Sequence, residues 1–289
     1  MRHVAIVVAK NEERFIGRML RSLRAQTGPP DLVYVVDDGS TDGTAAIVRQ
    51  MRADWPALHL VSRPAGIPRT HEDGVVPAFL AAYDRCREMD FTYVSRLDAD
   101  IEFPPDYFQT LLDHLDANPG WGMAGGVPYE EVGGEARGWR MPAHHVAGAL
   151  KTMRRRAFDE IGGFVPTYSW DIVDGVAMRA KGWRTGWLPL RVEHLRPHGS
   201  YNGVLRGRVK WGEGAWTIGS HPLYALARGA YLMASNRPYG LAGAAFWWGY
   251  LRAALRRTPR IAEVEITRAL RREQLGRLLR LFRLHRLPV

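Results

Sequence analysis

The chain has 289 residues, of which 46% are hydrophobic and 24% are charged, and these values exclude a disordered or fibrous protein. Its single cysteine, Cys86, excludes an internal disulfide and is typical of a reducing compartment. At this length we expect one large α/β domain, or one domain with an appended segment.

The net charge of +10 is concentrated toward the C-terminal end of the sequence. From Arg206 onward there are 16 Lys and Arg residues against 4 Asp and Glu residues, whereas residues 1–205 hold 24 against 26. The basic segment therefore predicts an anionic surface as a partner, either a membrane or a nucleic acid. Nucleic acid is the less favoured of these two.

Strand and helix patterns alternate through the first hundred residues. Residues 3–9 are apolar almost throughout, as in a strand that is buried on both faces of a parallel sheet. Further strands are predicted over 32–36, 58–62 and 93–98, and helices over 15–23, 45–51 and 75–86. This alternation predicts a parallel sheet with right-handed crossovers. Because Met1-Arg2-His3 runs directly into the first strand, we expect no signal peptide and a cytoplasmic protein.

Three polar clusters follow strands of this sheet: Asn11-Glu12, Asp37-Asp38 and Asp98-Ala99-Asp100. Ligands of open α/β sheets bind beyond the carboxyl ends of the strands. Asp98 and Asp100 are two residues apart, so in an extended segment they face the same way and can converge on one hard cation. A solvated acidic turn is the alternative. Asp38 is suited to accept hydrogen bonds from a base or ribose.

These motifs together resemble the family-two inverting glycosyltransferases, which have the GT-A fold. The resemblance also includes VVDDGSTDGT at 35–44, RRAFDEIGGF at 155–164 and WD at 170–171, and it covers about residues 3–200. It implies an α/β fold of GT-A type, which is Rossmann-like, with a mostly parallel sheet flanked by helices and followed here by a basic helical extension.

The resemblance also implies a nucleotide-diphosphate sugar as donor and a divalent cation, Mn²⁺ or Mg²⁺. The candidate donor-binding residues are Ala9, Asn11, Glu12, Asp38, Asp98 and, for the diphosphate, Arg69. The candidate metal ligands are Asp98, Asp100 as the principal ligand, and His194, with His198 as the alternative to His194. Around Arg69 the sequence departs from the family, because residues 66–74 lack the usual Gly-rich segment with an Ala-Arg-Asn run.

Two carboxylates are candidates for the general base. The family's usual Glu-Asp pair is replaced here by Trp170-Asp171, and Asp174 follows three residues later. Asp171 precedes Arg179 and Gly182 at the intervals of the family, whereas Asp174 would shift this register. We therefore expect Asp171 to be the base and Asp174 to orient the acceptor or cap the helix.

The predicted domains are a GT-A domain over 1–205 and a basic, aromatic-rich, mainly helical region over 206–289. In the first, residues 1–100 form the nucleotide-binding half and residues 101–205 the acceptor half. Within the acceptor half we expect a helix over 107–115, a strand over 123–127 and a loop over 133–138. That loop either closes over the donor sugar or is a plain surface connection.

The C-terminal region has no apolar run long enough to span a bilayer, because the run over 240–251 is too short. An apolar stripe near the end predicts an interfacial helix on anionic lipid. The alternative is a helix packed on the protein itself or on a second copy. The stripe consists of Leu270, Leu275, Leu278, Leu279 and Phe282.

We therefore expect a metal-dependent, inverting hexosyltransferase that transfers sugar to an acceptor hydroxyl in the synthesis of cell-surface polysaccharide or glycolipid. The expected partners are a nucleotide sugar, a saccharide or lipid-linked acceptor, an anionic membrane surface and a second copy of the chain. One alternative is a nucleotidyltransferase that makes activated sugars, although its usual Gly-rich start is absent. The other is a catalytically silent protein that binds sugar or nucleic acid.

Overall fold

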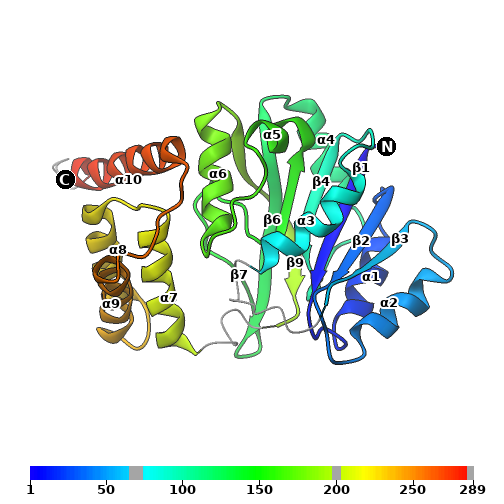
Figure 1. The fold of residues 1–289 in the computed structure, drawn as a ribbon, viewed down its shortest axis with the longest axis horizontal. Coiled ribbons are helices and arrows are strands. Elements are labelled where there is room, and N and C mark those ends of the chain that lie inside the picture. Colours follow the sequence, from blue (N-terminus) through cyan, green and yellow to red (C-terminus); the bar gives the residue numbers. More distant parts are fainter. Residues whose placement is uncertain (65–73, 197–202, 285–289) are drawn as a thin grey trace. The chain divides into compact units, whose positions relative to one another are not determined.

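The structure is a computed structural model that describes residues 1–64, 74–196 and 203–284. The chain divides into two compact units. The first consists of Met1–Pro166 and Lys181–His198, and the second of Thr167–Ala180 and Gly199–Val289. Figure 1 shows the sheet of the first unit and the helices of the second.

The first part of the sheet is parallel, as the alternating sequence pattern predicts. Its strands are β1 (His3–Ala9), β2 (Leu32–Asp37), β3 (Leu58–Ser62) and β4 (Tyr93–Asp98), which lie in the order β3-β2-β1-β4. The helices that connect them are α1 (Ile16–Arg24), α2 (Thr44–Arg52) and α3 (Val75–Cys86). Every residue of β1 is buried, because both faces of the strand are covered. Helix α1 buries Ile16, Met19, Leu20 and Leu23, which are spaced to lie on one side of a helix.

The rest of the sheet is mixed. Its strands are β5 (Ile101–Glu102), β6 (Trp121–Val132), β7 (Glu135–Gly138), β8 (Leu150–Arg154) and β9 (Arg184–His194), and its helices are α4 (Tyr107–Ala117) and α5 (Arg155–Glu160). Beyond β4 the order continues β8-β6-β9-β5. Strands β6 and β9 are parallel, while β8 runs antiparallel to β4 and to β6. This mixed α/β architecture with flanking helices confirms the expected fold class.

The segment 133–138 is a β-hairpin, so the prediction of a loop there was wrong for Glu135–Gly138. Strand β7 pairs with the end of β6, with Val132 opposite Glu135. Gly133 and Gly134 form the turn and have φ angles of 64° and 82°. Two-residue hairpin turns require such positive φ angles, which glycine adopts without a steric penalty.

The second unit is helical. It contains α6 (Trp170–Ala180), α7 (Val204–Thr217), α8 (Pro222–Ser235), α9 (Leu241–Leu255) and α10 (Val264–Leu284). Ala225, Leu232 and Phe246 form a small core between α8 and α9. Among the described residues, no helix is both long enough and apolar enough to cross a membrane.

Helix α10 packs within this unit through its first half. Leu270, from the predicted apolar stripe, is 5% exposed. Glu273 accepts hydrogen bonds from Arg179 of α6, and the Gln274 side chain bonds to Ser220 and to the backbone of His221. In the described part of the helix, the start of the stripe is therefore a packing surface.

Candidate active site

The carboxyl ends of β1, β2 and β4 bring the three polar clusters together. Ala9 is paired with Asp37 across β1 and β2, and Val8 is paired with Asp98 across β1 and β4. The buried Ala9 accepts a hydrogen bond through its carbonyl from the Asp38 backbone at 2.9 Å. Clusters that are up to about ninety residues apart in sequence therefore lie at one edge of the sheet.

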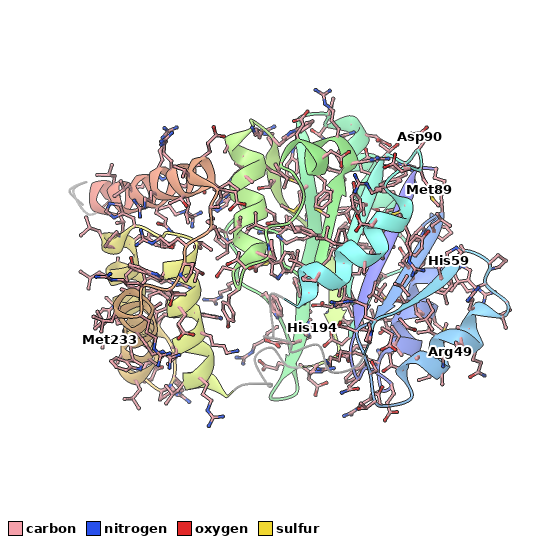
Figure 2. All side chains as sticks on the ribbon, in the orientation of Figure 1. Arg49, His59, Met89, Asp90, His194 and Met233 are labelled. Atoms are coloured by element: carbon pink, nitrogen blue, oxygen red, sulfur yellow. The ribbon has the colours of Figure 1, made fainter. Side chains whose placement is uncertain are left out.

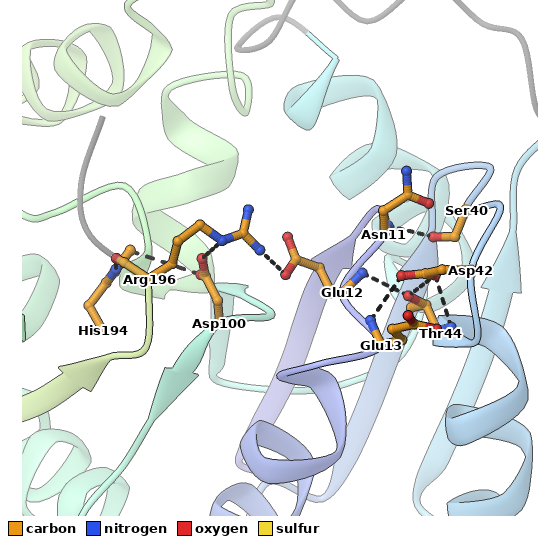
Figure 3. Close-up of polar contacts among 9 residues, drawn as sticks. All are labelled: Asn11, Glu12, Glu13, Ser40, Asp42, Thr44, Asp100, His194 and Arg196. Atoms are coloured by element: carbon orange, nitrogen blue, oxygen red, sulfur yellow. Dashed lines mark hydrogen bonds and ion pairs between the residues drawn. The ribbon is translucent and has the colours of Figure 1, made fainter. Parts of the chain in front are cut away.

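Two loops at this edge are hydrogen-bonded to one another (Figure 3). The Asn11 amide donates to Ser40 Oγ at 2.9 Å. The Asn11 side-chain carbonyl accepts from the Thr41 amide at 2.8 Å. The Glu12 amide donates to Thr44 Oγ1 at 2.8 Å. Asn11 has a φ of 55°, which this residue type tolerates better than most others. In this structure the Asn11 side chain holds the loops together, and its role toward a nucleotide stays a prediction.

Asp38 is a buried carboxylate beside a cation. It is 5% exposed and accepts a hydrogen bond from Arg63 Nη1 at 2.5 Å. Arg63 follows β3, which neighbours β2, and its amide donates to the carbonyl of Asp37. Arg63 was not predicted as a site residue, although a basic residue directly after a neighbouring strand was the available signal in the sequence.

Asp98, Asp100 and His194 form a group that can hold a metal ion. One ligand atom from each lies within 4.8 Å of the others. The pairing of β5 with β9 brings them together, because Ile101 lies opposite His194 and the Leu195 amide donates to the Asp100 carbonyl at 2.8 Å. His194, at the carboxyl end of β9 (Figure 2), has its Nε2 3.9 Å from Asp100 Oδ1. Two carboxylates and an imidazole are a suitable donor set for Mn²⁺.

Negative charge is crowded at this group. Burial and the neighbouring Asp98 raise the pKa of Asp100. Burial and Asp100 raise the pKa of Glu12 to about 7, although Arg196 acts in the opposite direction. Because buried carboxylates that share a site resist ionisation together, a divalent cation would stabilise their charged forms.

Arg196 connects the two sides of the site. Its guanidinium contacts the Glu12 carboxylate and lies 3.5 Å from Asp100 Oδ2 (Figure 3). Its carbonyl oxygen is hydrogen-bonded to His194 Nδ1. Arg196 was not predicted either, since its position two residues after His194 is the only signal for it in the sequence.

Arg96 is a further cation at this candidate metal-binding group. Its Nη2 lies 2.5 Å from Asp98 Oδ1, and its Nη1 donates to the carbonyl of Gly148 at 2.6 Å. The Arg96 side chain is buried and points from the middle of β4 toward the end of that strand. It therefore holds the Asp98 carboxylate in place.

The two candidate bases lie on α6, in the second unit. Asp171 is in the first turn of the helix and is half-buried. Asp174 is 2% exposed and accepts a hydrogen bond from the Gly175 amide at 2.5 Å. The choice between them stays a prediction. Arg69 and His198 lie outside the described residues.

Comparison with curated proteins finds relatives whose names describe the synthesis of glycolipids or of polyprenyl-linked sugars. A beta-monoglucosyldiacylglycerol synthase of Synechocystis sp. is 27% identical over 242 residues, which are 76% of this chain and 48% of that protein. A polyprenol monophosphomannose synthase of Mycolicibacterium smegmatis is 34% identical over 108 residues, which are 37% of each protein. The chain thus spans about half, or less, of the length of these relatives.

Comparison with solved structures finds the same fold. A mannosyltransferase of Pyrobaculum calidifontis in complex with GDP-Man and Mn²⁺ has a TM-score of 0.59 and 22% identity, over 97% of this chain and 80% of that one. Residues 1–349 of S. aureus TarS in complex with UDP-GlcNAc have a TM-score of 0.55 and 18% identity, over 75% of this chain and 66% of that one. These likenesses confirm the GT-A fold.

The family model for glycosyl transferase family 2 matches residues 4–172, which include the three strand-end clusters and the first turn of α6. The match covers more than half of the chain. The chain therefore belongs to glycosyl transferase family 2.

Proposed function

We propose that this protein is a metal-dependent, inverting glycosyltransferase that moves a sugar from a nucleotide-diphosphate sugar to an acceptor hydroxyl. The observation that carries this proposal is the convergence of Asp98, Asp100 and His194 beside the nucleotide-binding candidates Glu12 and Asp38. Family membership and a fold neighbour that was solved with GDP-Man and Mn²⁺ support the same chemistry.

Asp98, Asp100 and His194 are the residues that would hold the cation. When bound, the cation would neutralise negative charge on the departing diphosphate. The imidazole nitrogen of His194 favours Mn²⁺ over Mg²⁺, because Mg²⁺ prefers oxygen ligands alone. We therefore expect Mn²⁺ to support activity at lower concentration than Mg²⁺.

The other side chains at the strand ends suit the donor. The buried Asp38 carboxylate is proposed to accept hydrogen bonds from the base or ribose, with Arg63 holding it in place. Arg196 is proposed to bind the diphosphate. Its guanidinium already contacts a metal-ligand candidate, so an anion bound beside Asp100 would compete for it.

Asp171 is proposed to remove the proton from the acceptor hydroxyl, which then attacks the anomeric carbon in one displacement and inverts it. The names of the relatives support a lipid acceptor, and a saccharide is the alternative. With a lipid acceptor the protein would work at the cytoplasmic face of a membrane.

The test is an activity measurement with a panel of nucleotide sugars, with lipid and saccharide acceptors, and with Mn²⁺ or Mg²⁺. We expect one donor to release nucleoside diphosphate in the presence of metal. In a parallel assay with nucleoside triphosphates and sugar 1-phosphates, release of pyrophosphate would instead identify a nucleotidyltransferase. Binding of the donor without turnover would identify a silent sugar-binding protein.

The metal site is tested by Asp100→Ala. We expect this variant to abolish transfer and to remove the metal-dependent part of nucleoside diphosphate binding in calorimetric titrations, because the principal ligand is lost. Asp90→Ala removes an exposed carboxylate after α3 and is the matched control, which should behave like the wild type. Wild-type transfer without metal in Asp100→Ala would contradict the proposed site.

A further inference from the structure

Helices α8 and α9 expose a set of large apolar side chains, here called the α8–α9 face. Its members are Leu223, Leu226 and Tyr231 on α8, and Leu241, Trp248, Leu251 and Leu255 on α9, and each is between 51% and 71% exposed. The spacing of three, four and seven residues places those of α9 on one side of that helix. The two helices pack on one another at Gly229 and Gly243, so these exposed side chains belong to neighbouring helices.

This face lacks the charges that normally keep a helix surface in water. The sequence of α8 contains one charged residue, Arg228, and that of α9 contains one, Arg252. Arg252 is turned toward α7, where its Nε donates to Glu213 at 2.8 Å. Exposed apolar surface without interspersed charge indicates a contact with an apolar partner.

The charges around the face are almost all positive. Residues 206–262 include nine Lys and Arg residues and one acidic residue, Glu213. Arg228 stacks on Tyr231, which belongs to the face, with 5.5 Å from its guanidinium carbon to the ring centre. The partner therefore combines an apolar part with negative charge.

Arg208 of α7 adds to the positive charge around the α8–α9 face. Burial lowers the pKa of Arg208, and the positive charge of Arg228 lowers it further. The Nε atom of Arg208 is buried and, among the described residues, has no hydrogen-bond partner. An anionic group next to these two arginines would relieve their repulsion.

We propose that the α8–α9 face binds the surface of an anionic lipid bilayer. Helix α9 has 15 residues and is about 22 Å long, which is too short to span a bilayer and suits a helix that lies in its plane. Leucines enter the boundary of the acyl chains, Trp248 and Tyr231 occupy the interfacial level, and the arginines reach lipid phosphates. This proposal rests on the proposed function in one respect only, which is that the acceptor is a lipid.

Two other assignments fit the structure less well. The stripe of α10 begins with the buried Leu270, and this part of α10 is bonded to Arg179 and Ser220. A second copy of the chain on the α8–α9 face would bring two sets of arginines together, because symmetric dimers use the same surface twice. Anionic lipid satisfies both the apolar surface and its charge.

The test is co-sedimentation of the full chain with vesicles of phosphatidylcholine alone or with phosphatidylglycerol, in the absence of donor, metal and acceptor. We expect binding to the anionic vesicles. The double variant Leu226→Glu/Leu251→Glu should weaken it by at least about tenfold, because two exposed leucines that the bilayer would bury are replaced by charges. Leu279→Glu is the matched control, since Leu279 of α10 is 59% exposed, and it should bind like the wild type.

Arg228→Gln should weaken binding to anionic vesicles and reduce its dependence on salt. Circular dichroism of each variant checks the fold. Absence of wild-type binding, or an equal loss with Leu279→Glu, would overturn the proposal. So would a dimer in solution that the double variant dissociates while vesicles bind neither protein, because the partner would then be a second copy. Nucleoside diphosphate release with a soluble acceptor, measured in parallel, tests the proposed function separately.

Discussion

Asp171 and Asp174 lie three residues apart on α6 and differ in burial. Asp174 is almost fully buried and its carboxylate accepts from the Gly175 amide, whereas Asp171 is half-buried. A general base must reach the acceptor hydroxyl, which favours the more exposed carboxylate. We predict that Asp171→Asn lowers kcat by roughly 10² to 10⁴ and leaves nucleotide affinity nearly unchanged, because shape is kept and basicity is lost.

The matched variant for this prediction is Asp174→Asn. An amide oxygen can still accept from Gly175, so we expect this variant to keep most of its transfer activity. Steady-state kinetics and nucleoside diphosphate titrations of both variants provide the comparison. Should Asp174→Asn be inactive while Asp171→Asn turns over normally, the base is Asp174 and the register taken from the family is wrong.

At the scale of elements, glycines let α7 and α9 approach closely. A Cβ atom on Gly249 would meet the carbonyl oxygen of Val209 at 1.9 Å, and one on Gly212 would meet that of Phe246 at 2.0 Å. Backbone atoms cannot move aside as a flexible side chain can. We predict that Gly249→Ala destabilises the second unit by about 1–3 kcal/mol or more, measured as a lower midpoint in urea unfolding.

Gly276 of α10 is the control for this prediction. It lies inside a helix, and a Cβ atom there would meet nothing within 4 Å. Because alanine restricts the unfolded chain more than glycine does, Gly276→Ala should stabilise by about 0.4–1 kcal/mol. Equal effects of the two substitutions would mean that α7 and α9 do not cross at these glycines.

At the scale of the molecule, the buried His3 links stability to pH. Its Nε2 lies 2.7 Å from Ser95 Oγ, which lies 2.7 Å from Thr152 Oγ1, so the contact connects β1, β4 and β8. Burial lowers the pKa of His3 from its ordinary 6.5 to about 3. Below pH 6.5 the unfolded chain therefore binds a proton that the folded chain does not, and the free energy of unfolding falls as the pH falls toward 3.

Between pH 7 and pH 5, the titration of His3 in the unfolded chain lowers the free energy of unfolding of the first unit by about 2 kcal/mol. Glutamine does not titrate. We therefore predict that the free energy of unfolding of His3→Gln, measured with urea at pH 7 and pH 5, changes by about 2 kcal/mol less than that of the wild type. The other histidines contribute equally to both proteins. An identical pH dependence of wild type and variant would show that His3 titrates normally in the folded state.

Local patterns in the sequence were sufficient to predict the strands and helices of the first half of the sheet and the acidic clusters that follow its strands. The bounds predicted for β3 and α3 agree with the structure. The periodicity of apolar residues that indicates each element, and the turn residues that limit it, are both local features of the sequence. Asp98 and Asp100 were likewise found from their position after a strand. The hairpin strand β7 was missed because its residues are mostly exposed and carry no apolar alternation.

The remaining parts of the site depended on pairing between distant segments. The family resemblance named His194 as a candidate ligand, but His194 meets Asp100 only because β9 pairs antiparallel with β5. Arg196, which was not predicted, reaches Glu12 across 184 residues of sequence. Local propensity does not encode such pairing or its register. Motifs that are local in the sequence were enough to predict the fold family and the carboxylates after the strands. Two features became visible only in the folded structure, because they depend on how distant elements pack. They are the arginines that contact those carboxylates and the helices of the basic region whose large apolar side chains are exposed.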